Sequence, residues 1–346
     1  MGTRWMILGL AAGCALSLAA ACGGGDDDLG GELAAGGQEP IPQEPELGGG
    51  DPGETAPPDI DGDLGTGVSY EGCAKVDFLF VVDNSISMRD QQAALIASFP
   101  GFMSAIEATL TADDYHIMVV DTDDKTRCTK ANCTSGDMNA NELCVQPAGG
   151  YACNTTFEAC DKKIGAGVVH PAGKGASNQP CTVYGGNRYI VQGEPDLVGT
   201  FSCMAKVGLA GHYAERPMDS LVAAVSPEMN SGCNDGFLRD DAILVVTFIS
   251  DDPWYEDAGT PQDWYDAVVA AKNGDPESVV VLGLTPNYPE CRPNAEPPKG
   301  AHWSEFVAMW GERGLEGSVC SDDYAGFFAQ AISVIDDTCD DFEPPE

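Results

Sequence analysis

Short, almost uninterrupted apolar runs alternate with stretches of helical periodicity over most of the chain after residue 72. A run that is apolar at odd and even positions alike is typical of a strand buried on both faces, as in a parallel sheet. On this pattern we expect four strands, over residues 76–82, 115–121, 242–249 and 278–284. The first run has no charge after Asp77 and stops abruptly at Asp83.

Apolar residues recur at helical spacing between these runs. In the first such segment the repeating positions are Leu95, Phe99, Phe102, Ile106 and Leu110. Pro100 lies inside it and predicts a kink or a restart of the helix. Further helices are expected over residues 218–225, 261–272, 302–313 and 322–337. Strands that alternate with helices predict an α/β fold, a doubly wound and mostly parallel sheet flanked by helices.

One region, from residue 124 to about 205, breaks this alternation. Its pattern is too irregular to predict a packed helix or sheet, and it is rich in Gly, Asn and Lys. It also contains seven cysteines, namely Cys128, Cys133, Cys144, Cys153, Cys160, Cys181 and Cys203. We interpret this region as a disulfide-rich insertion in the α/β domain.

Two of the predicted strands end in acidic residues. Asp83, Ser85 and Ser87 follow the first strand as an Asp-x-Ser-x-Ser motif, and Asp251 follows the strand over residues 242–249. Open α/β sheets bind ligands at the carboxyl ends of their strands, so we expect these side chains to lie close together. Carboxylate and hydroxyl oxygens suit Mg²⁺, Ca²⁺ or Mn²⁺. The alternative for either serine is an N-cap of the following helix.

This combination resembles the von Willebrand factor A family, and the resemblance covers residues 73–339. The family implies a Rossmann-like sheet and a divalent cation at a metal-ion-dependent adhesion site. That site is made of an Asp-x-Ser-x-Ser loop, a Thr on a second loop and an Asp on a third. Asp83, Ser85 and Ser87 match the first element and Asp251 matches the last.

The Thr of the family pattern has no counterpart in this chain. It should fall within residues 211–217, where Glu215 is the nearest oxygen ligand. With three carboxylates the site should hold its cation more tightly, favour Ca²⁺, and attract a partner's carboxylate less. We therefore expect a partly structural metal, with recognition resting also on the insertion. The alternative for Glu215 is a carboxylate that only interacts with a helix N-terminus.

The amino-terminal residues, 1–21, have the pattern of a secretory signal peptide. Arg4 precedes an apolar stretch, and three alanines precede Cys22. This resembles a bacterial lipoprotein signal, in which the cysteine after the cleavage site carries a lipid. The alternative is a permanent transmembrane helix, for which the stretch is short.

Residues 22–72 are predicted to be a disordered, acidic tether rich in Gly and Pro. From residue 23 to residue 72 there are thirteen acidic residues and no Lys or Arg, so the segment cannot bury enough apolar surface to fold. A short acidic tail is expected over residues 340–346. The net charge of −38 argues against nucleic acid as a partner. Contact with a membrane is expected through the N-terminal lipid only.

The cysteine count indicates disulfides. Of fourteen cysteines, Cys14 and Cys22 belong to the signal and lipid positions, which leaves an even number in a chain with an export signal. Zinc would favour paired Cys-x₂-Cys motifs, which the chain lacks. Since domain termini often lie close together, we predict a disulfide between Cys73 and Cys339. A second prediction pairs Cys291 with Cys320.

The sequence favours a binding protein over an enzyme. The four histidines are scattered, and the chain has no His-Glu-x-x-His motif and no nucleophile elbow. We expect an exported, lipid-anchored module of the cell envelope, at the outer membrane or cell surface, that binds a protein or another surface ligand. The main alternative is a structural envelope lipoprotein whose metal and disulfides only stabilise it. A hydrolase is the more remote alternative.

Overall fold

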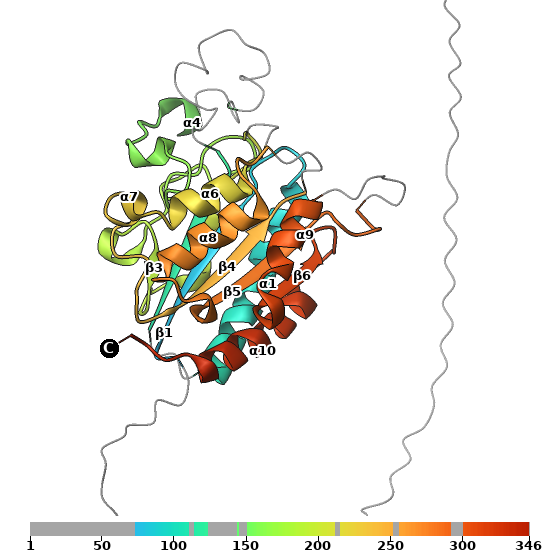
Figure 1. Cartoon of the computed structure of the whole chain (residues 1–346). Coiled ribbons are helices and arrows are strands. Elements are labelled where there is room, and N and C mark those ends of the chain that lie inside the picture. The colour runs from blue at the N-terminus through green and yellow to red at the C-terminus, as the bar shows by residue number, and fades with distance from the viewer. Residues whose placement is uncertain are drawn as a thin grey trace, which may run out of the picture. The chain divides into compact units, whose positions relative to one another are not determined.

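The structure is a computed structural model of the whole chain (Figure 1). It describes residues 73–110, 114–123, 144, 151–211, 215–251, 256–291 and 300–345. The chain divides into two units, Met1–Gly65 and Thr66–Glu346, and every described residue belongs to the second. The predicted signal peptide, Cys22 and the acidic tether therefore lie outside the described residues.

One sheet of six strands forms the centre of the second unit. The strands are β1 Lys75–Val82, β2 Asp114–Asp121, β3 Ile190–Val191, β4 Ile243–Ile249, β5 Val279–Thr285 and β6 Gly314–Ser318. Their spatial order is β3-β2-β1-β4-β5-β6, and every neighbouring pair is parallel except β2 and β3. The strand order therefore reverses at β1, and the predicted α/β fold with a mostly parallel sheet is confirmed.

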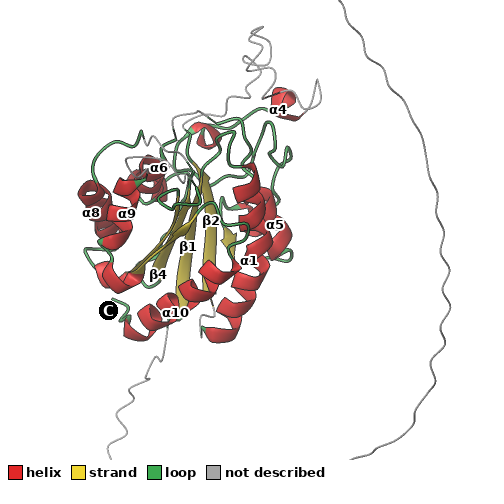
Figure 2. Ribbon diagram, turned by 90° about the vertical axis from the view of Figure 1, so that its right-hand side faces the viewer, coloured by secondary structure: helices red, strands yellow, loops and turns green. Residues whose placement is uncertain are grey.

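Helices cover both faces of this sheet (Figure 2). The α-helices are α1 Arg89–Thr109, α4 Tyr151–Asn154, α5 Leu197–Ala205, α6 Pro217–Ala224, α7 Pro227–Asn230, α8 Pro261–Ala271, α9 Ala301–Ala308 and α10 Ala325–Asp341. Short 3₁₀ turns occupy η1 Cys160–Lys162, η2 Tyr184–Gly186, η3 Pro276–Ser278 and η4 Gly311–Arg313. One layer contains α1, α5 and α10, and the other contains α6, α8 and α9.

Each face of the sheet has its own apolar core. In β1, Phe78 and Phe80 belong to the core under α1, α5 and α10, whereas Leu79 and Val81 belong to the opposite core. Alternate side chains of a strand point to opposite faces, so a strand between two helix layers must be apolar at every position. This is the physical reason why the four uninterrupted apolar runs predicted four strands.

The predicted restart at Pro100 is wrong, because α1 is one helix of 21 residues that contains Pro100. A proline inside a helix costs roughly 3 kcal/mol or more. Phe99, Phe102 and Ile106 lie on the same helix and are almost completely buried. Burying each such side chain contributes roughly 1.5–3 kcal/mol, so their packing outweighs the lost hydrogen bond.

The insertion is more ordered than its sequence pattern suggested. Helix α5 packs in the core, where the ring of Phe201 stacks on Phe99 with centroids 3.5 Å apart. Asp196 caps this helix by accepting a hydrogen bond from the backbone N–H of Gly199 at 3.0 Å. Strand β3 of the same region pairs with β2. The expectation of no packed helix or sheet was therefore wrong for this part of the insertion.

Strand β6 was not predicted either. Its sequence, Gly-Leu-Glu-Gly-Ser, contains a single large apolar residue, because β6 is an edge strand whose first four residues are only partly buried. A Cβ at Gly314 would lie 2.2 Å from a backbone carbonyl oxygen of α9, and one at Gly317 would lie 2.5 Å from the ring of Phe327. Close packing therefore selects glycine here and removes the apolar pattern.

The two predicted disulfides are confirmed. Cys73 is bonded to Cys339, which joins the start of β1 to the end of α10, and Cys291 is bonded to Cys320. Two further bonds hold the insertion, one within it and one to the segment before β4, namely Cys181–Cys203 and Cys160–Cys233. Cys144 and Cys153 are disulfide-bonded as well, whereas Cys128 and Cys133 lie outside the described residues.

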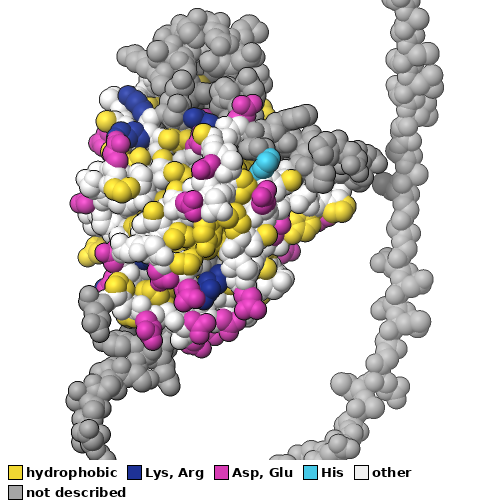
Figure 3. Space-filling model, in the orientation of Figure 1, with side chains coloured by type: hydrophobic (Ala, Val, Ile, Leu, Met, Phe, Trp, Pro, Cys, Tyr) yellow, Lys and Arg dark blue, Asp and Glu magenta, His cyan; other side chains and the backbone are white. Residues whose placement is uncertain are grey.

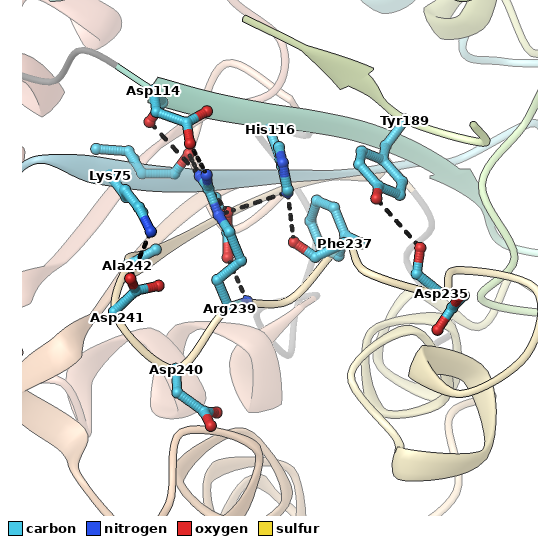
Figure 4. Close-up of polar contacts among 12 residues, drawn as sticks. Lys75, Asp114, His116, Tyr189, Asp235, Phe237, Arg239, Asp240, Asp241 and Ala242 are labelled. Atoms are coloured by element: carbon cyan, nitrogen blue, oxygen red, sulfur yellow. Dashed lines mark hydrogen bonds and ion pairs between the residues drawn. The ribbon is translucent and has the colours of Figure 1, made fainter. Parts of the chain in front are cut away.

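A polar cluster closes the amino-terminal edge of the sheet (Figure 4). Asp77 of β1 is fully buried and accepts hydrogen bonds from the backbone N–H (2.7 Å) and Nε (2.8 Å) of Arg239. Arg239 also donates from Nη1 to Asp114 at 2.6 Å. His116 lies in this cluster with Nδ1 2.8 Å from the carbonyl oxygen of Phe237. These contacts fasten the loop before β4 to β1 and β2.

No helix in the part of the chain that the structure describes is long and apolar enough to cross a membrane.

Candidate metal centre

The adjacent ends of β1 and β4 bring the predicted acidic residues together. Val82 pairs with Ile249 in the sheet register, and the backbone N–H of Asp83 donates to the carbonyl oxygen of Ile249 at 3.0 Å. The hydroxyl of Ser250 donates to Oδ2 of Asp83 at 2.6 Å. Asp83 is fully buried, so its carboxylate is held rigidly at the carboxyl edge of the sheet.

The serines of the first loop extend this contact to Asp251. The backbone N–H of Ser85 donates to Oδ1 of Asp83 at 2.6 Å, and the hydroxyls of Ser85 and Ser87 lie 3.1 Å apart. Ser87 then donates from Oγ to Oδ1 of Asp251 at 2.8 Å. Four of the five predicted ligands therefore form one hydrogen-bonded cluster, which combines two carboxylates with two hydroxyls.

The alternative role of the serines as helix caps is wrong. Met88 stands at the N-cap position of α1, and no side chain caps that end of the helix. The hydroxyls of Ser85 and Ser87 instead face each other and Asp251. The motif therefore directs its oxygens into the site and not to the helix.

Glu215, the fifth predicted ligand, reaches the loop through other residues. It is fully buried, and Thr122 at the end of β2 donates a hydrogen bond from Oγ1 to its Oε2. The same hydroxyl of Thr122 lies 3.3 Å from Oδ1 of Asn84, which is the residue after Asp83. Glu215 therefore lies next to the loop that carries Asp83, Ser85 and Ser87, which we call the metal loop. The hydroxyl of Thr122 lies between Glu215 and this loop.

Two contacts fix the segment that carries Glu215. Gly211 donates from its backbone N–H to the carbonyl oxygen of Asn84 at 2.9 Å, and a Cβ there would lie 2.0 Å from Asn84 Oδ1. Only glycine permits this approach. On the other side, Oδ1 of Asp257 accepts hydrogen bonds from Met218 N (2.7 Å) and Asp219 N (3.0 Å), which caps the first turn of α6.

Thr122 was not predicted to take part in the site. The available signal was its position, since β2 is parallel to β1 and ends at the same edge of the sheet. Its relation to Glu215 could not be read from spacing, because 93 residues separate the two. Glu215, the ligand predicted in place of a threonine, is thus itself hydrogen-bonded by a threonine from another loop.

Burial dominates the electrostatics of the cluster. It raises the pKa of Asp83 to about 7, and the negative charge of Asp251 adds to this effect. Hydrogen bonds from Ser250 and from the backbone of Ser85 act in the opposite direction. A buried carboxylate with a second carboxylate nearby is stabilised in its ionised form by a cation.

A divalent cation fits the donor chemistry of this cluster. Mg²⁺ is typically bound by one or two carboxylates together with hydroxyl or water oxygens, which is what Asp83, Ser85, Ser87 and Asp251 offer. No three His, Cys, Asp or Glu side chains among the described residues are grouped to hold a metal. Hydroxyls and water would therefore supply much of the coordination, with Glu215 as an additional donor beside the loop.

Two of the histidines that the structure describes make contacts away from this site. The ring of His116 contacts the carbonyl oxygen of Phe237 at the opposite edge of the sheet. His170 lies 3.2 Å from a carboxylate oxygen of Asp161, in the insertion. His212 lies outside the described residues. Neither the contact of His116 nor that of His170 involves Ser85, Ser87 or Asp251.

Comparisons with known proteins give little information. No protein-family model matches the chain, and no curated protein is similar to it. Among solved structures, proximal thread matrix protein 1 from the mussel byssus matches with a TM-score of 0.38 and 11% sequence identity. The match covers 76% of this chain and 49% of that one, so the chain spans about half the length of that protein. At this TM-score the similarity carries no conclusion about fold or function.

Proposed function

We propose that this protein is a non-enzymatic binding module of the von Willebrand factor A type. It holds a divalent cation at the Asp83 loop and recognises a protein or another surface ligand there. The observation that carries this proposal is the hydrogen-bonded cluster of Asp83, Ser85, Ser87 and Asp251. The cluster lies at β1, where the strand order reverses, and open α/β sheets bind ligands in the crevice at such a point.

An exposed apolar side chain in the metal loop supports binding over a purely structural role. Ile86 stands between the two serines and is 62% exposed. This side chain lies where a partner bound at the loop would cover it. A partner that contacts the metal loop would bury this side chain and gain roughly 1.5–3 kcal/mol from doing so.

The bound cation would present its remaining coordination position to an oxygen of the partner. Asp83 and Asp251 together neutralise the charge of a divalent cation. If Glu215 also joined the coordination, the site would carry a net negative charge, and the cation would attract a partner's carboxylate only weakly. This is why Glu215, hydrogen-bonded by Thr122, matters for the choice between Mg²⁺ and Ca²⁺. Ca²⁺ accepts more oxygen ligands than Mg²⁺ and tolerates irregular geometry.

The compartment belongs to the same proposal. Disulfides such as Cys73–Cys339 persist in oxidising surroundings, which agrees with export through the signal at residues 1–21. A lipid on Cys22 and the acidic tether would then hold the module at the cell envelope, at a typical reach of roughly 40 Å from the membrane.

The test is calorimetric titration of the full, disulfide-bonded chain with Mg²⁺, Mn²⁺ and Ca²⁺, beside Asp83→Asn. We expect one cation per chain in the wild type, with affinity reduced by about 10–100-fold or more in the variant because a charged ligand is lost. Asp266→Asn is the matched control, since this exposed carboxylate lies on α8 and accepts a hydrogen bond from Gln262. Its affinity should equal that of the wild type.

Absence of binding in a folded, fully disulfide-bonded wild type would overturn the proposal. The structural alternative makes a different prediction for a chain that does bind the metal. Under that alternative a chelator lowers the melting temperature but leaves partner capture at the cell surface unchanged, whereas a metal-dependent binding module loses its partner as well.

A further inference from the structure

A small cavity lies beside the candidate metal centre. Its polar walls come from the insertion, through Asp161, Lys163, His170 and Arg188, and from the strand ends, through Asp121 and Asn84. Most of the remaining lining is apolar or glycine. The cavity therefore joins the insertion to the carboxyl edge of the sheet, and the metal cluster does not use its charged groups.

Arg188 is held rigidly on one wall. Its Nε donates to the carbonyl oxygen of Gly167 at 2.8 Å, and its Nη2 donates to Oδ1 of Asp161 at 2.5 Å. Burial alone would raise the pKa of Asp161, but the bonds from Arg188 hold it below its ordinary value. Asp161 is thus an anion that orients the guanidinium. Among the described residues Nη1 of Arg188 has no hydrogen-bond partner, so it is available to a ligand.

Asp121 provides the opposite charge on another wall. Its backbone is fixed at the end of β2, where its carbonyl oxygen accepts a hydrogen bond from Ser220 at 2.5 Å. Burial raises the pKa of its carboxyl to about 7, with a further contribution from Asp123. A cationic group at this position would stabilise the carboxylate.

The two charges face the same cavity without neutralising each other. Within the described part of the chain no ion pair joins Asp121 to Arg188, so their charged atoms are more than 4.0 Å apart. They are close enough, however, for the guanidinium to lower the pKa of Asp121. A ligand that contacts both groups needs a positive group for Asp121 and a negative group for Arg188.

We propose that this cavity binds a small zwitterion of the α-amino acid class, with its ammonium group at Asp121 and its carboxylate at Arg188. A guanidinium is the side chain best suited to a planar carboxylate, since it can donate two parallel hydrogen bonds. The cavity has a volume of about 500 Å³, part of it open to solvent, which gives room for a single amino acid.

The charge distribution of the chain agrees with this assignment. Residues 124–205 carry seven Lys or Arg and seven Asp or Glu, so the net charge of −38 resides entirely in the rest of the chain. On the face shown in Figure 3, most Lys and Arg side chains lie toward the insertion, while Asp and Glu side chains crowd the opposite edge near α10. The insertion is therefore where a ligand with a carboxylate meets the least repulsion.

The test is a thermal-shift and calorimetric screen of the full, disulfide-bonded chain against the common amino acids, in the presence of a chelator. A chelator removes any cation from the metal centre but does not act on this cavity. Amino acid binding in the cavity should therefore persist even where the proposed function fails. L-Alanine is compared with propionate, which lacks the ammonium group, and with ethylamine, which lacks the carboxylate. We expect at least tenfold weaker binding of both analogues than of the amino acid.

Asp121→Asn should weaken amino acid binding at least tenfold and leave the affinity for propionate within about twofold, because only the ammonium contact is lost. Asp235→Asn is the matched control, since that carboxylate lies outside the cavity, and it should bind like the wild type. Absence of binding by every amino acid overturns the proposal. Equal binding of propionate, or of inorganic phosphate, overturns it too, since either would indicate a general anion site.

Discussion

Glu215 stands where the proposed family assignment would place a threonine. A threonine hydroxyl would be a neutral ligand, whereas Glu215 is a buried carboxylate that is linked to the Asp83 loop through Thr122 and Asn84. The hydroxyl of Thr122 donates to Glu215 and so compensates part of the cost of burying it. If a cation binds at the Asp83 loop as proposed, Glu215 would join the coordination of a large ion more easily than that of a small one.

Glu215→Gln tests this role at the scale of a single residue. It keeps the shape and the hydrogen-bond acceptor for Thr122 but removes the charge. We expect the affinity for Ca²⁺ to fall by about tenfold or more and the affinity for Mg²⁺ to change less, because Mg²⁺ is served by one or two carboxylates and water. Competition calorimetry with both ions measures the ratio.

The neighbouring variant Glu256→Gln is the control, since Glu256 is exposed and only its backbone N–H contacts the carbonyl oxygen of Glu215. It should leave both affinities unchanged. Equal losses for the two ions in Glu215→Gln would show that the residue acts by general electrostatics and does not select the ion.

The sequence predicted those residues of the site that share one loop or directly follow a predicted strand. Asp83, Ser85 and Ser87 share one loop, and Asp251 follows a second apolar strand whose carboxyl end was expected at the same edge of the sheet, as the pairing of β1 with β4 shows. Thr122 and Asn84 escaped prediction because their role depends on which strands are adjacent and on the approach of Gly211 to the loop. Such contacts between distant segments leave no periodic trace in the sequence.

At the scale of elements, prediction succeeded where burial is complete. Strands β1, β2, β4 and β5 are apolar throughout because helices cover both of their faces. Strands β3 and β6 lie at the two edges of the sheet, where one neighbour is missing and the apolar run is interrupted. Helix α5 was hidden among cysteines and glycines, although its buried face, including Phe201, completes the core beside α1.

The two predicted disulfides close loops of very different length. This difference allows a test at the scale of elements. Cys73–Cys339 spans 266 residues and Cys291–Cys320 spans 29. In the chain-entropy model the longer loop contributes roughly 5 kcal/mol to the free energy of unfolding and the shorter one roughly 3–4 kcal/mol. Urea denaturation of each double Cys→Ala variant measures the two contributions. A larger loss for Cys291–Cys320 would contradict the entropic order and point to local strain or packing at the longer bond.

At the scale of the whole molecule, several buried acidic groups lie at the carboxyl edge of the sheet. Asp83, Glu215 and Asp257 are all buried there, and each hydrogen bonds to a hydroxyl or an N–H group. Burial raises the pKa of Asp83 and of Asp257 to about 7. The folded chain therefore retains protons that the unfolded chain has already released, which links its stability to pH and to cations.

The sign of this linkage follows from the direction of the shifts. An unfolded Asp releases its proton near pH 4, and these folded groups do so near pH 7. Between these values the folded state binds more protons, so the free energy of unfolding falls as pH rises, by at most about 1.4 kcal/mol per pH unit for each group. We expect the chelated protein to be more stable in urea at pH 5 than at pH 8. Added Mg²⁺ or Ca²⁺ should raise the urea midpoint more at pH 8, where a cation no longer competes with the proton on Asp83.

Asp257→Asn separates the general effect of net charge from the effect of these buried groups. The amide keeps an acceptor for Met218 and Asp219 but cannot titrate, so the decline in stability between pH 5 and pH 8 should become shallower. Asp266→Asn removes the same charge from an exposed position on α8 and should leave the slope unchanged. Equal slopes in both variants would mean that repulsion across the whole acidic surface, and not the buried carboxyls, makes the fold sensitive to pH.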